Sequence, residues 1–435
     1  MKYSKKMLLL NHIKSKVNKS KSFVSSQKER LLMRILWITM ESILPSNSGG
    51  RLGVFKRLEQ IAKTEEIYLF YSYDYRHELS YVDDLKKYCR EVYPYYRKKN
   101  LIHALLHIVK YPFTVASRDI PKMQRDIVTC IENHDVQVIN VDFPHMCVNL
   151  LPLKIPIPII LNEHNIEWKL YKNIAKSQRN IMKRILYEVD SFRLKRYETM
   201  ITNKMDISLF TFVSEKDMSY MELEGSVNKL KSKLIPVGAD VRTCVVDNKD
   251  SIQKRDGDKI ILFVGKMSYG PNIEAVIWFS NKILPKILND IPDCKFYIVG
   301  KDPDDVVQKL SGDHIVVTGE VESVDEYYIK ADIVVLPLLN GGGVKVKLLE
   351  AISFNKIVIS TSIGVEGTIY TDGESIAVSD DVYEFSCLCI TALKYPSTYF
   401  EKSKRAYNIF ETYYTWESIG ETYRNAIKSL VNCND

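Results

Sequence analysis

The second half of the chain alternates short apolar runs with helical segments, and this alternation limits the fold more than any other feature. Continuous apolar strands separated by helices are typical of parallel sheets that are covered on both faces. The expected strands are 260–264, 295–299, 315–318, 333–337 and 356–360, and the expected helices lie near 272–288, 303–310, 323–330 and 344–354. The pattern therefore predicts an α/β domain with a doubly wound parallel sheet.

The first half follows the same pattern more loosely. Its expected strands are 34–40, 67–71, 136–141, 157–162, 207–213 and 234–237, with a helix over 51–63 after a polar loop. A chain of 435 residues with 46% hydrophobic content is long enough to bury two cores. The predicted organisation is a basic N-terminal extension (1–32), a Rossmann-like domain (33–246), a polar linker (247–258), a second Rossmann-like domain (259–400), and a helical tail (401–435) that packs back toward the first domain.

Positive charge is concentrated at the N-terminus. Residues 1–30 carry nine Lys or Arg and one Glu, which is a net charge of +8. The whole chain carries +7, so residues 31–435 carry −1. A folded surface without excess positive charge argues against a nucleic-acid partner. The basic extension permits peripheral contact with an anionic membrane, or it is a solubilising segment. The charged helical stretch 180–204 is either a solvated face or a membrane-facing surface.

The cysteines and the first apolar run indicate a cytoplasmic location. The eight cysteines include no CxxC pair and no metal-ligand spacing, and several lie in apolar patterns, as small core residues do in a reducing compartment. The apolar run 7–10 is too short for a signal peptide or a membrane span. We therefore expect no metal requirement and no bound cofactor.

A glycine run at the start of a helix is the strongest candidate for a binding site. The run consists of Gly341, Gly342 and Gly343 and follows the strand 333–337. Small residues at the start of a helix let the backbone approach a ligand, and their free amides, together with the amide of Val344, favour a phosphate group. Two lysines in the next positions, Lys345 and Lys347, add positive charge, and Glu350 can accept hydrogen bonds from a ribose diol. The alternative is a glycine-rich turn before an ordinary helix.

Two more loops of the second half reach the same edge of the sheet. Lys266 follows the strand 260–264 and places a cation there, unless it is merely solvated. The loop 363–367 follows the strand 356–360 and brings Gly364, Glu366 and Gly367, unless it is a plain turn. Ligands of open parallel sheets bind beyond the carboxyl ends of the strands, which favours the functional interpretation.

In the first half, His164 follows the strand 157–162 and can bond a sugar hydroxyl or relay a proton, although a locally satisfied histidine fits as well. Glu163, Asn165 and Glu167 surround it as candidates for an acceptor side. The loop before the helix 51–63 contributes Gly50 and Arg51. Its spacing is not GxGxxG, so the dinucleotide fingerprint is missing.

Taken together, these residues resemble the retaining GT-B glycosyltransferases of the large group-one family, and most closely the bacterial enzymes of exopolysaccharide, capsule or lipopolysaccharide synthesis. The resembling segments run in the family's order from Met33 to Tyr423. They are MRILWIT with GGR after it, LNEHNIEW, RYE with DISLFTFVSEKD, IPVGAD, FVGKMSYGPNIEAVIWF, FYIVG, ADIVVLPLLNGGGVKVKLLEA, VISTSIGVEG and TWE.

The resemblance implies two Rossmann-like domains facing across a cleft, with the nucleotide-diphosphate sugar, such as a UDP or GDP sugar, bound by the second. Glu350 matches the second glutamate of the E-x7-E pattern, which holds the ribose. Lys266 stands where the family has an arginine on the diphosphate, His164 matches a histidine near the donor sugar, and Gly50 matches a glycine loop near the phosphates. The implied activity is transfer of a hexose to a glycan or lipid-linked acceptor with retention of configuration, with His164 and Lys266 as its catalytic residues.

Two departures bear on the donor. Gly342 occupies the position of the first glutamate of E-x7-E, and Pro271 and Asn272 stand where the family has a second phosphate cation. Lys345 or Lys347 is expected to replace that charge.

Three alternatives follow from the sequence. A GT-B sugar-nucleotide epimerase and a nucleotide-sugar-binding protein without transferase activity would both keep the donor-binding residues. A dinucleotide oxidoreductase is disfavoured because neither half carries GxGxxG with a later ribose carboxylate.

Overall fold

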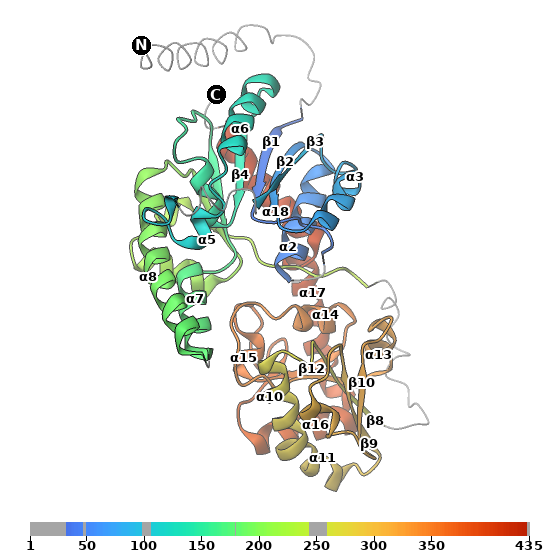
Figure 1. Cartoon of the computed structure of the whole chain (residues 1–435). Coiled ribbons are helices and arrows are strands. Elements are labelled where there is room, and N and C mark those ends of the chain that lie inside the picture. The colour runs from blue at the N-terminus through green and yellow to red at the C-terminus, as the bar shows by residue number, and fades with distance from the viewer. Residues whose placement is uncertain (1–31, 47–48, 98–105, 179, 243–258, 433–435) are drawn as a thin grey trace, which may run out of the picture.

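Two α/β domains make up the structure, which is a computed structural model describing residues 32–46, 49–97, 106–178, 180–242 and 259–432 (Figure 1). Each domain is built on one parallel sheet with helices on both faces, as the sequence predicts. The expected linker 247–258, residues 1–31 of the expected extension, and residues 433–435 lie outside the described residues.

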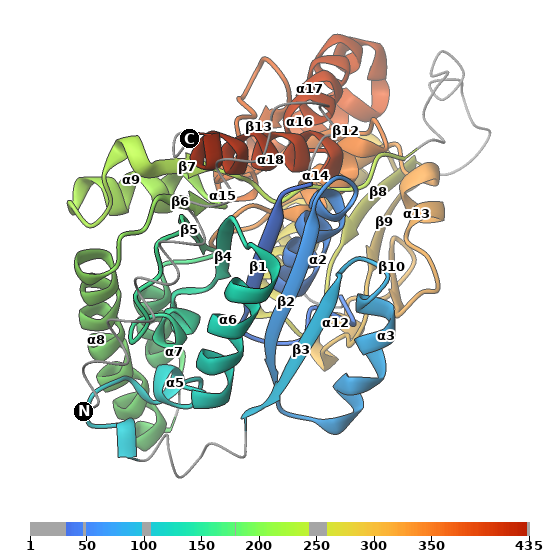
Figure 2. The same ribbon diagram turned by 90° about the horizontal axis from the view of Figure 1, so that it is seen from above.

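The first sheet has seven parallel strands in the order β3-β2-β1-β4-β5-β6-β7, which Figure 2 follows from one edge to the other. The strand order reverses between β1 and β4. The strands are β1 (Arg34–Thr39), β2 (Glu66–Tyr73), β3 (Glu91–Tyr96), β4 (Val138–Asp142), β5 (Ile159–Glu163), β6 (Leu209–Phe212) and β7 (Ser232–Leu234).

The second sheet has six parallel strands in the order β10-β9-β8-β11-β12-β13, and its order reverses between β8 and β11. The strands are β8 (Lys259–Val264), β9 (Cys294–Val299), β10 (Ile315–Gly319), β11 (Ile333–Leu336), β12 (Ile357–Ser360) and β13 (Ala377–Val378). Four of the five strands expected here are apolar and fully or nearly buried at their centres, which explains why periodicity found them.

The helices of the first domain include a long antiparallel pair, α7 and α8, at its outer side (Figure 1). They are α2 (Gly49–Ala62), α3 (Val82–Leu85), α5 (Phe113–Ala116), α6 (Pro121–His134), α7 (Glu167–Ser177), α8 (Ile181–Lys204) and α9 (Glu215–Leu223). Those of the second domain and tail are α10 (Gly270–Trp278), α11 (Leu284–Asp290), α12 (Asp305–Gln308), α13 (Asp325–Lys330), α14 (Val346–Ser353), α15 (Ser362–Val365), α16 (Val382–Lys394), α17 (Phe400–Tyr413) and α18 (Trp416–Asn432).

The two helices of the C-terminal tail belong to different cores. Phe410 of α17 packs with α14 in the second domain, whereas Tyr423 of α18 is buried with Trp37 of β1 in the first. The chain therefore crosses between the domains a second time, near Tyr414. The chain first leaves the first domain after β7, near Ala239. This first crossing lies beside the second one, because the Ala239 amide donates to the Tyr414 carbonyl oxygen at 3.0 Å.

Some elements were not predicted. The edge strand β3 carries Pro94 and polar neighbours, β13 has only two residues, and α16 follows it directly. The expected helix 272–288 is one continuous helical stretch in which a π-helical turn, Phe279–Ile283, joins α10 to α11. Five cysteines are buried, as predicted for small core residues: Cys89, Cys130, Cys147, Cys294 and Cys389. No helix in the described part of the chain is long and apolar enough to cross a membrane.

Candidate active site between the sheets

The carboxyl ends of the two sheets face each other. Lys216 lies in α9, just after β6, and Glu366 lies just after β12 and α15. Their side chains form an ion pair with an Nζ–Oε1 distance of 2.6 Å. Loops that follow strands in one domain therefore meet loops that follow strands in the other, as a site shared by two Rossmann-like domains requires.

In the second domain, the glycine run lies at the point where the strand order reverses. Gly341 and Gly343 follow β11 and have φ values of 126° and 70°, which only glycine adopts without strain. A Cβ atom on Gly367 would lie 3.3 Å from the Val344 side chain, so the loop 363–367 packs directly on the glycine run. The structure thus brings together two of the loops that the sequence singled out.

Lys347 reaches from α14 to the loop after the neighbouring strand β8. Its Nζ lies 2.7 Å from Oδ1 of Asn272 and 4.2 Å from the ring centre of Phe263. A Cβ atom on Gly265 would lie 2.6 Å from that Nζ, so the ammonium group lies directly against the backbone of Gly265. Burial lowers the pKa of Lys347 to about 7.

The other two lysines lie differently. Lys345 donates from Nζ to the Gly343 carbonyl oxygen at 2.6 Å, and burial lowers its pKa. Lys266 is about half exposed, and its Nζ lies 3.4 Å from a carboxylate oxygen of Asp302. Of the three expected cations, Lys347 is the one that lies against both the β8 loop and the start of α14.

Glu350 lies one turn further along α14. The Tyr328 hydroxyl lies 3.4 Å from one of its carboxylate oxygens, and the Tyr328 ring stacks on Phe354 at 4.8 Å. Burial raises the pKa of Glu350, and the charges of Arg242 and Lys347 oppose that shift. The carboxylate is thus held in place by the packing of its neighbours.

In the first domain, His164 belongs to a buried charged cluster at the ends of β4 and β5. Its Nε2 lies 3.0 Å from Oδ1 of Asp142 and 2.9 Å from Nη2 of Arg57. Arg57 also bonds Asp142 at 2.8 Å, and the Trp37 indole donates to the same carboxylate. The imidazole stacks on Phe143 with ring centres 4.3 Å apart.

These contacts fix the orientation of His164. Burial and the Arg57 charge lower its pKa, although Asp142 opposes the shift, so the imidazole is neutral near pH 7. Burial alone would raise the pKa of Asp142, but Arg57 and His164 hold it below its usual range. Nε2 already contacts Asp142 and Arg57. Nδ1 bonds no residue within the described ranges. Nδ1 is therefore the ring atom that a ligand can use.

The remaining predicted residues of this domain lie in two other settings. Gly50 is exposed at the start of α2, and Arg51 pairs with Glu41 at 2.5 Å and with Glu78 at 3.3 Å. Asn165 is exposed.

Glu163 and Glu167 lie in a group of buried carboxylates with Glu198. Burial raises the pKa of Glu167 to about 7 and that of Glu198 to about 8, and it raises the pKa of Glu163 well above its usual value. Within the part of the chain that the structure describes, no group of three or more His, Cys, Asp or Glu is arranged to hold a metal ion.

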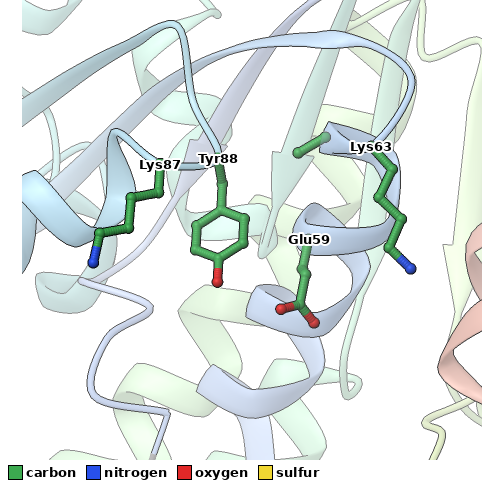
Figure 3. A pocket seen from close by; sticks show the side chains of 5 residues that line it. Glu59, Lys63, Lys87 and Tyr88 are labelled. Carbon is green, nitrogen blue, oxygen red and sulfur yellow. The ribbon is translucent and has the colours of Figure 1, made fainter.

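A pocket with a volume of 410 Å³ lies elsewhere, between the C-terminal half of α2 and the segment after α3 (Figure 3). It is lined by Glu59, Ala62, Lys63, Lys87 and Tyr88. Because α2 runs antiparallel to the strands beside it, its C-terminal end lies at the amino edge of the sheet, away from the loops described above.

Three residues of the candidate site were not predicted. Asp142 ends β4 next to the point where the strand order reverses, and this position could have identified it. Arg57 lies in the middle of α2, where a charged residue in the sequence predicts a solvent-exposed face. In the structure its exposed fraction is only 2%. Asn272 was identified only as a position where the resembled family has a cation and this chain has none.

Comparisons with known proteins agree with this architecture. Residues 258–394 match the family model described as Glycosyl transferases group 1. An uncharacterised protein in the cps region of Klebsiella pneumoniae is 25% identical over 366 residues, which cover 82% of this chain and 89% of that protein.

The solved structures that resemble this chain include three with very low sequence identity. Sucrose-phosphate synthase from Thermosynechococcus elongatus has a TM-score of 0.60 and 14% identity, covering 92% of this chain and 100% of that one. Anabaena HepE in complex with UDP has a TM-score of 0.62 and 11% identity, covering 91% and 100%. The lipopolysaccharide outer core galactosyltransferase WaaB has a TM-score of 0.60 and 11% identity, covering 91% and 99%.

The predicted pair of facing Rossmann-like domains is thus confirmed, and the chain has the GT-B fold with a C-terminal domain whose residues 258–394 match the group 1 glycosyltransferase model.

Proposed function

We propose that this protein transfers a sugar from a nucleotide-diphosphate sugar to a hydroxyl group of a glycan or lipid-linked acceptor, with retention of the anomeric configuration. The observation that carries the proposal is the position of Lys347. Its ammonium lies against Gly265, at the reversal point of the second sheet, and α14, which carries it, begins at Val346, three residues after the glycine run. A buried cation beside the backbone amides of a glycine run suits a diphosphate.

The diphosphate is the group that these residues would hold. Lys347 supplies the charge that the resembled family places in the first turn of α10, where this chain has Asn272. Backbone amides of the run 341–344 supply hydrogen bonds, and Lys345 supplies a second charge when its side chain leaves the Gly343 carbonyl oxygen. Lys266 lies at the rim and contributes long-range attraction.

The nucleoside would lie beside Glu350. Its carboxylate is held by Tyr328 and can accept two hydrogen bonds from the ribose hydroxyls. Because Gly342 replaces the family's first glutamate, we assign the donor sugar to backbone contacts with the glycine run and to Nδ1 of His164 across the cleft.

The chemical step follows from this arrangement. The bond between the anomeric carbon and the leaving phosphate oxygen breaks, and its electron pair stays on the nucleotide diphosphate, which Lys347 and the amides of the glycine run stabilise. The acceptor oxygen bonds the anomeric carbon on the same face, and its proton passes to the leaving phosphate. His164 orients the donor sugar and is neutral near pH 7 because burial lowers its pKa.

Relatives suggest which substrates to test first. HepE was solved with UDP and with UDP-glucose, so a UDP sugar is our first candidate, and a GDP sugar is the second. The relative from a cps region and the lipopolysaccharide enzyme WaaB support a role in cell-surface polysaccharide synthesis.

The deciding experiment combines binding with turnover. A panel of UDP, GDP and dTDP sugars is tested for thermal stabilisation, and the stabilising donor is then incubated with and without lipid-linked oligosaccharides. Nucleotide release that requires the acceptor, with a product anomer matching the donor by NMR, supports a retaining transferase. Conversion of the donor without acceptor would identify an epimerase. Tight binding without any conversion would identify a nucleotide-sugar-binding protein, and the loss of the first glutamate makes that outcome the main competitor.

A further inference from the structure

The outer face of α8 is an exposed apolar ridge. Six large side chains on this helix are each more than half exposed, with exposed fractions from 51% to 72%. At about 100° per residue they occupy one sector of about 140°. They are Ile181, Met182, Ile185, Leu186, Val189 and Phe192.

This ridge is separate from the face that holds α8 in the domain. The buried residues Leu194, Tyr197 and Ile201 lie on another side of the helix and belong to the core of the first domain. The helix pair α7 and α8 stands at the outside of the molecule in both views (Figures 1 and 2). The ridge therefore has no structural role in the domain core.

A second segment extends the apolar surface. The Phe113 amide donates to Asp190 at 3.1 Å, and Arg193 donates to the Tyr111 carbonyl oxygen at 2.6 Å, so residues 106–113 lie along α8. Three of their side chains are exposed as well: Leu106 at 73%, Val109 at 91% and Phe113 at 45%. Exposed apolar surface of this extent marks an interaction site.

Basic residues flank this surface. Lys172 and Lys176 on α7 and Lys183, Lys195 and Arg196 on α8 are exposed, whereas the acidic Glu167 and Glu198 of the same helices are buried. The exposed Glu188 is paired with Arg184. An exposed apolar ridge on a helix pair with exposed basic residues matches a helix that lies in the interface of an anionic membrane.

We propose that the ridge formed by α8 and the segment 106–113 docks the protein on an anionic lipid bilayer. At about 100° per residue Arg196 lies inside the apolar sector, and its guanidinium lies over the Phe192 ring. Positive charge and apolar side chains therefore share the outer side of α8, so docking there holds the first domain at the membrane surface. This inference does not depend on transferase activity, since binding to lipid is measured without any sugar donor.

The test is sedimentation of the full-length protein with vesicles of phosphatidylcholine, alone or mixed with phosphatidylglycerol. We expect binding to the mixed vesicles, and a drop of about tenfold in the partition coefficient for the double variant Leu186→Ser with Phe192→Ser. The variant Arg196→Gln should weaken binding to mixed vesicles and make the remaining binding less sensitive to salt.

A matched control is available in the second domain. Tyr383 and Tyr395 are exposed by 70% and 61%, and replacing both by Ser should leave vesicle binding unchanged. Equal binding by the wild type and the ridge variant would overturn the proposal. So would loss of binding after deletion of residues 1–30 while the ridge variant still binds, because the basic extension would then be the anchor. A wild-type dimer that the ridge variant converts to a monomer would show that a second copy covers this face.

Discussion

The Lys347 ammonium lies 2.7 Å from the side-chain oxygen of Asn272, so a cation carried by α14 lies against the first turn of α10. The two residues are 75 positions apart and belong to the helices that follow adjacent strands, β8 and β11. The charge that the resembled family keeps on α10 is thus present here at the same place but on the other helix.

Exchanging the two side chains tests whether the place of the charge matters. Lys347→Asn should weaken binding of the nucleotide sugar by about tenfold to a hundredfold, because a charge-assisted bond to phosphate is lost. Adding Asn272→Lys to that variant should restore most of the affinity. Titration calorimetry with the stabilising donor measures both. Unchanged affinity in the single variant would remove Lys347 from the donor site.

The affinity for the donor should also depend on pH. Burial lowers the pKa of Lys347 to about 7, so above that pH the free protein carries a neutral amine. A bound diphosphate favours the ammonium, so binding takes up a proton and the affinity falls as the pH rises from about 7 to 9. Calorimetry in buffers with different ionisation enthalpies measures this proton uptake. A Lys347→Met variant should bind weakly at every pH, and a pH-independent wild-type affinity would contradict the assignment.

His164 should affect turnover far more than donor binding. His164→Ala removes the contact of Nδ1 with the donor sugar but leaves the diphosphate contacts of the second domain in place. We expect kcat to fall by about a hundredfold or more and the donor Kd to change by less than about threefold. His134→Ala is the control, because His134 lies at the amino edge of the first sheet and pairs with Glu91. Equal losses in kcat and Kd for His164→Ala would place the imidazole elsewhere.

The sequence could predict the sheets because their strands are buried on both faces. Ile261, Leu262 and Phe263 of β8 are fully buried, and such strands appear as continuous apolar runs. The edge strand β3 escaped prediction because its residues are mostly half-buried and include Pro94. Strand ends also placed the glycine run and His164 correctly at the carboxyl edges of their sheets.

The partners within the site could not be predicted in the same way. Arg57 and His164 are 107 positions apart and meet only because α2 packs over the ends of β4 and β5. Periodicity places a charged residue on the solvated face of a helix, and no local pattern indicates that Arg57 is buried against Asp142. The same limit applies to Lys347 and Asn272, whose proximity depends on the order of β8 and β11 in the sheet.

The buried carboxylate of Glu198 should make the protein less stable at alkaline pH. Burial and the neighbouring Glu167 raise its pKa to about 8, while the unfolded chain ionises near the ordinary value of 4.5. Between these values the folded state holds a proton that the unfolded state has lost, so stability falls as the pH rises from about 4.5 to 8.

Glu198→Gln should remove the contribution of Glu198 to this dependence and leave those of Glu163 and Glu167. The amide oxygen can still accept from the Trp168 backbone amide, as the carboxylate does at 3.2 Å. We expect a gain of about 1 to 3 kcal/mol in the free energy of unfolding at pH 8 and almost none near pH 5, measured by denaturant titration. The exposed Glu132 serves as control, since Glu132→Gln should change stability little at either pH. A gain of equal size at both pH values would show that ionisation is not the cause.

Two glycine-to-alanine variants should change stability in opposite directions. A Cβ atom on Gly238 would lie 2.8 Å from the Tyr414 carbonyl oxygen and 2.7 Å from Cδ1 of Ile419, so Ala forces apart the two chain segments that cross between the domains. We expect a loss of about 1 to 3 kcal/mol in the free energy of unfolding. A Cβ atom on Gly53, inside α2, would meet nothing within 4 Å, and Ala there should stabilise the helix by up to about 1 kcal/mol. Because Tyr414 contributes backbone rather than a flexible side chain, adding Ile419→Val should not rescue Gly238→Ala. Rescue by that second change would mean that the Ile419 side chain, and not the crossing of the two segments, sets the tolerance at Gly238.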